Sequence, residues 1–180
     1  DEARESGNKM LGTTKRGIGP AYTSKVDRSG IRVSDVLQSS AELSVTELCK
    51  NLNSYLNHLG HKESALKDNL EVLHNAKNLF EKHISTDPNP FYEISKREKC
   101  VLEGAQGIQL DIDHGDYPFV TSSNTLPSYA SIGTPFPFSR IGSVVGVTKA
   151  YVTRVGQGPL KTEITDFVGE KIRKNGSEFG

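Results

Sequence analysis

Two amphipathic segments follow one another in the chain, between about residues 44 and 85. The first opens with Ser44-Val45-Thr46-Glu47, which reads as a capping box, and its apolar residues then recur at helical spacing: Leu48, Leu52, Tyr55, Leu56 and Leu59. After a short connection, a second set repeats this spacing: Leu66, Leu70, Leu73, Phe80 and Ile84. Gly60 ends the first segment, and Pro88 and Pro90 stop the second. The pattern predicts a helical hairpin.

Short apolar runs later in the chain predict strands. Cys100-Val101-Leu102, bounded by Glu103-Gly104, is typical of a buried strand, and Ala150 to Val155 alternates before a Gly-Gln-Gly-Pro turn. Ser143 to Lys149 between them could form a helix. Strand, helix and strand in this order favour an α/β fold with a mostly parallel central sheet, in which the hairpin is an insertion. At 180 residues, we expect one domain.

Between these runs lies a long segment, Ala105 to Gly142, with little periodicity. It is rich in glycine, proline, serine, threonine and aspartate, and it is much longer than a normal connection. Its five aromatic residues, Tyr117, Phe119 and Tyr129 among them, are unusual for a disordered tract. We therefore expect a packed functional loop.

The composition limits the possible partners and compartment. Lys+Arg and Asp+Glu balance at 22 each, so no net field attracts nucleic acid or an acidic membrane. No apolar run approaches the roughly 20 residues of a membrane span, and the chain does not open like a leader peptide. Cys49 and Cys100 lie outside metal-ligand spacing, as expected of reduced thiols. We expect a cytoplasmic protein with neither nucleic acid nor membrane as a partner.

Residues 12–20, GTTKRGIGP, combine three glycines with two threonines and two cations. Glycine allows close backbone approach, and hydroxyls and cations bind anions, so a phosphate is one candidate ligand. The run matches neither a Walker A loop nor the G-x-G-x-x-G of a dinucleotide fold. A plain glycine-rich turn with a solvated run of charges remains an alternative on composition alone.

Acidic residues gather in the stretch from Glu103 to Thr125. Asp111, Asp113 and His114 could serve a two-metal hydrolase, although turn-forming or capping aspartates are commoner. An EF-hand loop is excluded because its glycine and glutamate positions hold other residues. The polar run TSSNT, residues 121–125, could instead cap a helix and bind an oxyanion.

Residues 17–28 read Gly-Ile-Gly-Pro-Ala-Tyr, followed by Lys25 and Arg28. This run resembles the G-I-G-P-x-Y-x-x-K-x-x-R signature of the adenylosuccinate synthetase family. Further blocks resemble the same family in its order along the chain: GTTKRGIGPAY, EGAQG, LDIDHG, YPFVTSSNT and TRVGQGP. Several ordered blocks are far more specific than one. The resemblance covers most of the chain and implies a central sheet like that of the P-loop NTPases.

The resemblance also implies an activity and an assembly. The family joins the amino group of L-aspartate to inosine monophosphate (IMP) in purine nucleotide biosynthesis. It uses GTP and Mg²⁺, passes through a 6-phosphoryl intermediate, and releases GDP and phosphate with adenylosuccinate. Its members are homodimers, so we expect a ligase that works as a homodimer on these small molecules.

Family roles carry over by resemblance onto matching positions. Thr14 and Thr121 are expected to hydrogen-bond the phosphate of IMP. Arg28 is expected to reach that phosphate in the partner subunit's site. Gln106 is expected to contact the base near the reacting oxygen, and Val155 to line the base pocket. We expect these groups to converge on one nucleotide.

The chain also departs from the family pattern. Lys25 belongs to the signature, and we assign it only a tentative catalytic role. The family's N-terminal Gly-Asp-Glu-Gly-Lys-Gly-Lys loop, the histidine after it and the C-terminal part do not occur in these residues. We therefore expect the Mg²⁺ site in that N-terminal part, no metal ligand in this chain, and no turnover by this chain alone. Lys15, expected to face solvent, replaces a family glycine, and residues 126–139 replace a glycine-rich stretch.

One alternative from another class stays open. The chain could be a noncatalytic nucleotide-binding or dimerisation module of the same origin, which kept the IMP-site residues without the chemistry. The upstream sequence separates the two hypotheses, because only the ligase needs the Gly-Asp-Glu-Gly-Lys-Gly-Lys loop. A metal-dependent hydrolase is the weaker alternative.

Overall fold

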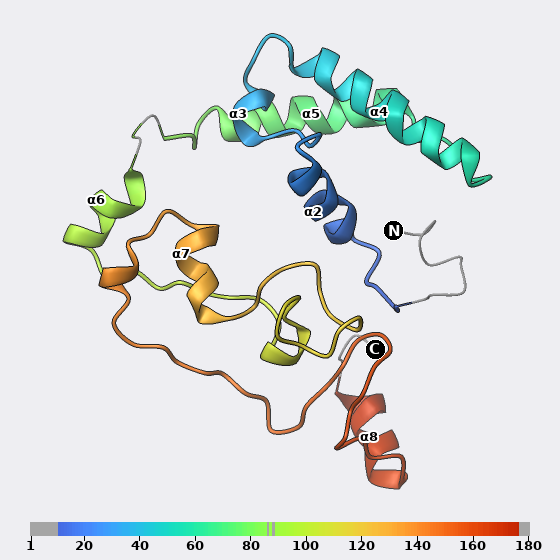
Figure 1. Ribbon diagram of the computed structural model, residues 1–180, viewed down its shortest axis with the longest axis vertical. Coiled ribbons are helices and arrows are strands. Elements are labelled where there is room, and N and C mark those ends of the chain that lie inside the picture. The colour runs from blue at the N-terminus through green and yellow to red at the C-terminus, as the bar shows by residue number, and fades with distance from the viewer. Residues whose placement is uncertain (1–10, 86, 88, 177–180) are drawn as a thin grey trace. The chain divides into compact units, whose positions relative to one another are not determined.

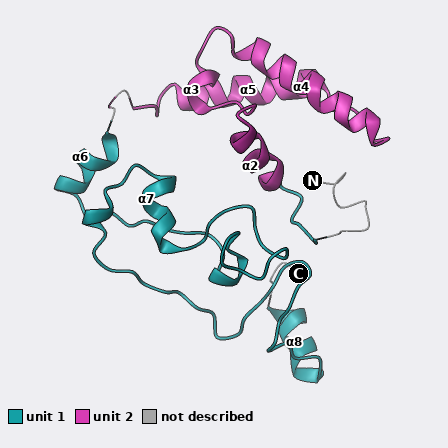
Figure 2. Cartoon of the chain, in the orientation of Figure 1, with its two compact units in different colours: residues 1–16, 89–180 teal, residues 17–88 magenta. Residues whose placement is uncertain are grey.

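The computed structural model of the protein describes residues 11–85, 87 and 89–176 (Figure 1). The chain divides into two compact units (Figure 2). Residues 17–88 form the first, which we call the helical unit, and residues 1–16 with 89–180 form the second, the loop unit. The expectation of a single domain stays a prediction. In the described part of the chain, every helix is too short or too polar to cross a bilayer.

The helical unit contains the predicted hairpin. Its helices are α2 (Ile18–Asp27), α3 (Val33–Val36), α4 (Ala41–His58) and α5 (Leu66–Phe80). Helices α4 and α5 run side by side, and α3 packs against α5 (Figure 1). The expected helical hairpin is therefore confirmed as α4 and α5.

A small apolar core holds this unit together. Its buried members come from α3, α4 and α5: Val36, Ala41, Val45 and Leu73. Partly buried side chains pack around them: Ile31, Leu70, Ala76 and Phe80. Burying such side chains stabilises a fold by about 25 cal/mol per Å² of apolar area removed from water. Apolar packing thus holds the helical unit. On α5 it uses the predicted Leu70, Leu73 and Phe80. On α4 the expected face is wrong, because Ala41 and Val45 are buried whereas Leu52, Tyr55 and Leu59 are exposed.

The start of α4 differs from the prediction, whereas its end agrees. The helix begins at Ala41, so Ser44 lies inside its first turns and is not the N-cap, and its hydroxyl donates to the Ser40 carbonyl. Such bonds to the preceding turn let serine remain within a helix. At the other end, Gly60 adopts φ 73°, and the Gly60 and His61 amides donate back into the last turn. This is a Schellman motif, which glycine favours.

The loop unit has only short helices. They are α6 (Pro90–Arg97), η1 (Ile108–Leu110), η2 (Pro127–Tyr129), α7 (Ala130–Gly133), η3 (Phe138–Arg140) and α8 (Phe167–Asn175). The carboxylate of Asp166 caps α8 by accepting from the Val168 and Gly169 amides. The apolar spacing of the sequence did not predict α8.

The predicted strands are wrong for the described residues, none of which lies in a β-strand. Residues 100–102 and 150–155 are irregular, and so are residues 143–149, for which a helix was possible. A strand exists only where a second strand completes its ladder of hydrogen bonds. Here apolar side chains of both predicted strands lie in solvent, as the 91% exposure of Val101 and the 58% exposure of Val152 show. The expected central sheet is therefore not part of this structure.

Candidate functional site

Asp111 is the centre of the long loop in the loop unit. It is fully buried, and its Oδ1 accepts from the Asp113 and His114 amides at 3.0 Å each. Its Oδ2 accepts from the Thr125 amide at 2.6 Å and the Leu126 amide at 3.3 Å. A buried charge is tolerated only when it is well hydrogen-bonded, which this carboxylate is. One side chain thus joins the two ends of the segment 111–126.

These bonds also decide the charge of the carboxyl group. Burial alone would raise the pKa of Asp111, but the four backbone N–H donors outweigh burial and lower its pKa to about 2. Both oxygens of Asp111 accept hydrogen bonds from backbone N–H groups, so this carboxylate is not free to bind a metal ion. Among the described residues, no group of three or more His, Cys, Asp or Glu side chains is placed to hold a metal ion. The geometry disfavours the hydrolase hypothesis at Asp111.

Main-chain bonds tighten the same loop. The Thr121 amide donates to the Leu110 carbonyl at 2.9 Å, and the Ile112 amide donates to the Ser123 carbonyl at 3.3 Å. The Thr125 hydroxyl donates to the Gly107 carbonyl at 3.0 Å. Thr121 is therefore fixed, through its backbone, against the turn that contains Asp111.

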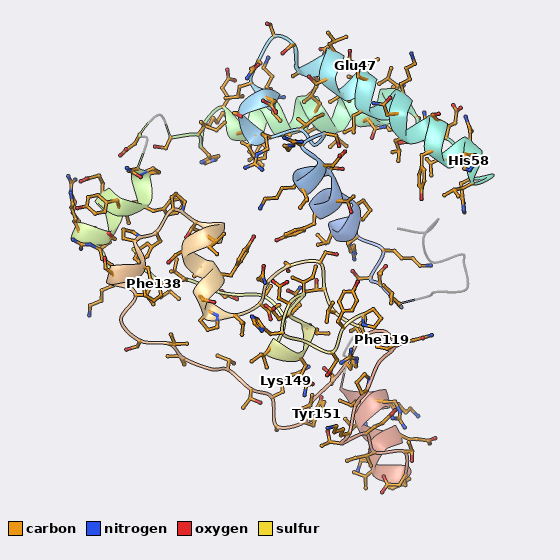
Figure 3. The ribbon with its side chains drawn as sticks, in the orientation of Figure 1. Glu47, His58, Phe119, Phe138, Lys149 and Tyr151 are labelled. Atoms are coloured by element: carbon orange, nitrogen blue, oxygen red, sulfur yellow. The ribbon has the colours of Figure 1, made fainter. Side chains whose placement is uncertain are left out.

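Arg154 connects this loop to the segment that follows Val152. Its side chain is only 6% exposed, and its guanidinium donates to the carbonyls of Phe119 (2.5 Å), Gln157 (3.1 Å) and Pro159 (3.4 Å). Figure 3 labels Phe119 in the loop unit. A planar guanidinium can serve several carbonyls at once, which lysine cannot do in this geometry. The loop of Thr121 and the loop of Val155 are thereby tied together.

Two glycines bring a third segment to the same place. A Cβ built on Gly12 would lie 2.6 Å from the Cα of Gly156, and one on Gly156 would lie 2.5 Å from the Gly12 carbonyl oxygen. Both have positive φ, 72° and 84°. The Gln157 amide also donates to the Leu11 carbonyl at 3.3 Å. Only glycine allows so close an approach of two backbones.

Four of the predicted site residues flank these contacts within the loop unit. Thr14 lies two residues after Gly12, and Val155 directly precedes Gly156. Thr121 lies two residues after Phe119, and Gln106 directly precedes Gly107. Thr14 and Gln106 are exposed, and Thr121 and Val155 are half-buried. The structure thus links the segments that carry these residues, while convergence of the four side chains on one ligand stays a prediction.

The other two predicted residues belong to the helical unit, at the end of α2. Lys25 is exposed, with its ammonium 5.6 Å from the centre of the Tyr22 ring. Arg28 is exposed and is the C-cap of α2, where its amide donates to the Ser24 and Lys25 carbonyls. Their predicted roles toward a phosphate stay predictions.

Three residues other than glycine adopt positive φ among the described residues: Lys15 (55°), Arg28 (65°) and Gln106 (60°). This left-handed conformation costs a residue with a Cβ about 1–2 kcal/mol. Such strain is concentrated at functional sites, where the surrounding structure maintains it. Arg28 and Gln106 are among the predicted nucleotide ligands. Lys15 is exposed, in agreement with the expectation that it faces solvent.

Two contributors to the loop architecture were not found from sequence. Asp111 was considered as a possible metal ligand and Arg154 was not considered at all. A buried carboxylate that accepts mainly from backbone N–H groups leaves no spacing signal, because its donors lie up to fifteen positions away. The divergent residues 126–139 contain η2, α7 and the start of η3, and Phe136 among them is buried.

Comparison with known proteins places this geometry in a family. The family model described as adenylosuccinate synthetase matches residues 1–180. Adenylosuccinate synthetase of Trichlorobacter lovleyi is 42% identical over all of this chain and 43% of its own length. That of Carboxydothermus hydrogenoformans is 44% identical over 99% of this chain and 43% of its length. The chain therefore spans less than half the length of these relatives.

A solved structure is similar as well. The structure titled fully ligated adenylosuccinate synthetase from Plasmodium falciparum aligns with 99% of this chain and 42% of that one. The TM-score is 0.82 and the sequence identity is 33%. The backbone described above is thus close to the corresponding part of that protein.

Proposed function

Because the chain belongs to the adenylosuccinate synthetase family, we propose that the full-length protein joins IMP and L-aspartate with GTP, giving adenylosuccinate, GDP and phosphate. The homologues are named adenylosuccinate synthetase, and this name supports a ligase of purine biosynthesis. In our proposal, this chain supplies part of the IMP site, and residues elsewhere in the full-length protein complete the catalytic centre.

One observation carries the proposal from fold to site. The segments bearing Thr14, Gln106, Thr121 and Val155 are distant in sequence, yet each predicted residue lies within two positions of a contact that joins those segments. A site for one small molecule needs polar groups that converge on it from several segments of a rigid scaffold. The linked loops of this unit provide several connected segments. This arrangement supports the proposal that their polar groups converge on one ligand.

The phosphate of IMP would be bound by neutral and charged donors. The Thr14 and Thr121 hydroxyls would each donate to a phosphate oxygen, and each such bond to a charged group contributes about 1.5–3 kcal/mol. Arg28 would supply the positive charge, since its planar fork can bind two phosphate oxygens together. In our proposal, it does so in the partner subunit's site, which makes the active unit a homodimer.

The base would be read by an amide and an apolar side chain. Gln106 offers a donor and an acceptor, which the hypoxanthine edge requires, and Val155 would contact the ring face. Lys25, on α2 with Arg28, would add positive charge near the reacting phosphoryl groups. Mg²⁺, bound in the N-terminal part of the protein, would neutralise the phosphates of GTP during phosphoryl transfer.

A threonine variant tests the phosphate contact. In the full-length protein, Thr121→Ala should raise KM for IMP roughly 10- to 100-fold, because one hydrogen bond to a charged group is lost, and should change KM for GTP much less. Thr46→Ala, which removes an exposed hydroxyl on α4, is the matched control and should change neither constant. Equal increases in both Michaelis constants would reject a phosphate contact by Thr121.

An arginine variant tests the role across the dimer. Arg28→Leu should weaken IMP binding while the dimer persists, and a mixed dimer containing one wild-type Arg28 should recover part of the activity. Unchanged turnover in the fully substituted dimer would reject the assignment. IMP binding without any adenylosuccinate formation by the wild-type protein would instead favour the noncatalytic nucleotide-binding module.

A further inference from the structure

The inference concerns the buried carboxylate of the long loop. Resting on the proposed function, we propose that Asp111 is a positioning residue that holds Thr121 in place to bind the phosphate of the nucleotide. Asp111 does not touch the ligand in this proposal. It acts through the backbone of the segment 121–126.

The two carboxylate oxygens have different tasks. Oδ1 accepts from the Asp113 and His114 amides, which shapes the turn that Asp111 itself begins. Oδ2 accepts from the Thr125 and Leu126 amides, which belong to the far end of the loop. Asp111 therefore connects the far end of the loop to the near end through two backbone N–H groups, beside the bonds from the Thr125 hydroxyl to Gly107 and from the Asn124 side-chain amide to Asp113.

Thr121 lies inside the fastened part. Its amide donates to Leu110, the residue before Asp111, and the carbonyl of Ser123 accepts from Ile112, the residue after it. The backbone around Thr121 is thus fixed at two points. Its own N–H is bonded to the Leu110 carbonyl, and the Thr125 and Leu126 amides that follow are bonded to Asp111. The direction of its half-buried side chain follows from a backbone fixed at these points.

The chemistry of the site needs aspartate rather than asparagine. Four N–H groups converge on two carboxylate oxygens, and each oxygen accepts two of them. An asparagine side chain has only one acceptor oxygen. Its NH₂ group is a donor, so it cannot accept hydrogen bonds from the N–H groups that it would face. Asp111→Asn keeps the size of the side chain and leaves at least two of the four donors unpaired.

A double-variant cycle in the full-length protein tests the proposal. Isothermal titration with IMP should show roughly 10- to 100-fold weaker binding for both Asp111→Asn and Thr121→Ala. Binding of inosine, which has no phosphate, should change by less than about twofold in Asp111→Asn. In the Thr121→Ala background, Asp111→Asn should cost little further affinity for IMP, since it acts through the group already removed.

The matched control is another carboxylate with the same kind of partners. Asp166 accepts from the Val168 and Gly169 amides through Oδ1 at the start of α8, and Asp166→Ala removes both of these bonds without touching the loop of Thr121. It should leave IMP affinity unchanged. Loss of IMP affinity in both aspartate variants would mean a general loss of structure and would overturn the specific role of Asp111.

Hydrogen exchange of the wild-type protein tests the same link without a substitution, in case Asp111→Asn does not fold. Bound IMP should slow exchange of the Thr121, Thr125 and Leu126 amides together. Protection of Thr121 alone would overturn the inference, as would losses of affinity that simply multiply in the double variant. If the wild-type protein does not bind IMP, or Thr121→Ala has no effect while Asp111→Asn does, the proposed function itself fails.

Discussion

The helical unit and the loop unit are stabilised in different ways. The helical unit buries apolar side chains between α3, α4 and α5, with Leu73 only 6% exposed. Among the described residues of the loop unit, the fully buried side chain is the carboxylate of Asp111, and the segments are joined by Asp111, Arg154 and closely approaching glycines. Apolar packing tolerates many sequences of similar volume, whereas hydrogen bonds to backbone groups require particular atoms at particular positions.

This difference can be compared with the positions of the predicted site residues. Apolar packing makes a rigid support, and loops fixed by specific polar contacts present binding groups. Four of the six predicted site residues lie on the loop unit, next to its fixing contacts. The comparison predicts that the two units respond to different kinds of substitution.

The largest effect is expected in the core of the helical unit. Leu73→Ala should lower the free energy of unfolding by about 2–5 kcal/mol, because it leaves a cavity between α3, α4 and α5. Denaturant unfolding, with hydrogen exchange followed in α4 and α5, measures this loss. Val72→Ala, at a side chain that is 68% exposed, is the control and should cost much less. Equal costs would break the contrast between the units, since the helical unit would then not depend on its core.

A glycine in the loop unit should have the next largest effect. A Cβ on Gly115 would lie 2.6 Å from the Asp111 carbonyl oxygen and closer still to that of Gln109. Gly115→Ala should therefore destabilise by roughly 1–3 kcal/mol through overpacking against backbone. Gly104→Ala, where a Cβ meets nothing within 4 Å, is the matched control for thermal unfolding of the full-length protein. A harmless Gly115→Ala would contradict a loop fixed by close backbone contact.

A smaller, stabilising effect is expected at Lys15. Its φ of 55° is unfavourable for a residue with a Cβ. Lys15→Gly should stabilise the protein by about 0.5 kcal/mol. It removes the backbone strain of the left-handed conformation, but part of this gain is lost because glycine gives the unfolded chain more conformational entropy. Lys15→Ala retains the strain and should give no gain in Tm. A similar gain from alanine would locate the effect in the lysine side chain instead of the backbone.

The smallest effect, absent at neutral pH, is the titration of Asp111. Its pKa is lowered from 3.8 to about 2, since backbone N–H groups overcome the opposing effect of burial. A depressed folded-state pKa stabilises the fold above about pH 4, and this contribution is lost as the pH falls through about 2. Exchange protection of the Thr125 and Leu126 amides should therefore be constant from about pH 8 to 5 and should fall only in strong acid. Loss of protection above pH 5 would mean that another group fastens the loop.

The sequence predicted the helical unit well for a physical reason. The periodic Leu70, Leu73 and Phe80 of α5 record the face that packs, and Gly60 marks the end of α4 because a left-handed C-cap favours glycine. On α4 the periodic leucines misled, because Ala41 and Val45 are buried and Leu52 is exposed. The sequence could not show in the same way whether residues 100–102 and 150–155 form strands. An apolar run shows that a segment can be buried in a sheet, but not that a neighbouring strand is there to pair with it.

The candidate site was reached through ordered motifs and not through local chemistry. EGAQG, YPFVTSSNT and TRVGQGP identified the segments of Gln106, Thr121 and Val155, and the family comparison agrees with that identification. The roles of Asp111 and Arg154 depend on backbone groups brought near by folding. Side-chain types along a sequence contain no record of such partners.

The contact between Gly12 and Gly156 has a consequence for anyone who redesigns this protein. Each backbone fills the space that a side chain on the other residue would need. A substitution at one of the two glycines therefore cannot make room for a side chain at the other. A library that randomises residues 12–20 must keep Gly12 constant, and grafting that loop into another scaffold requires transferring Gly156 along with it.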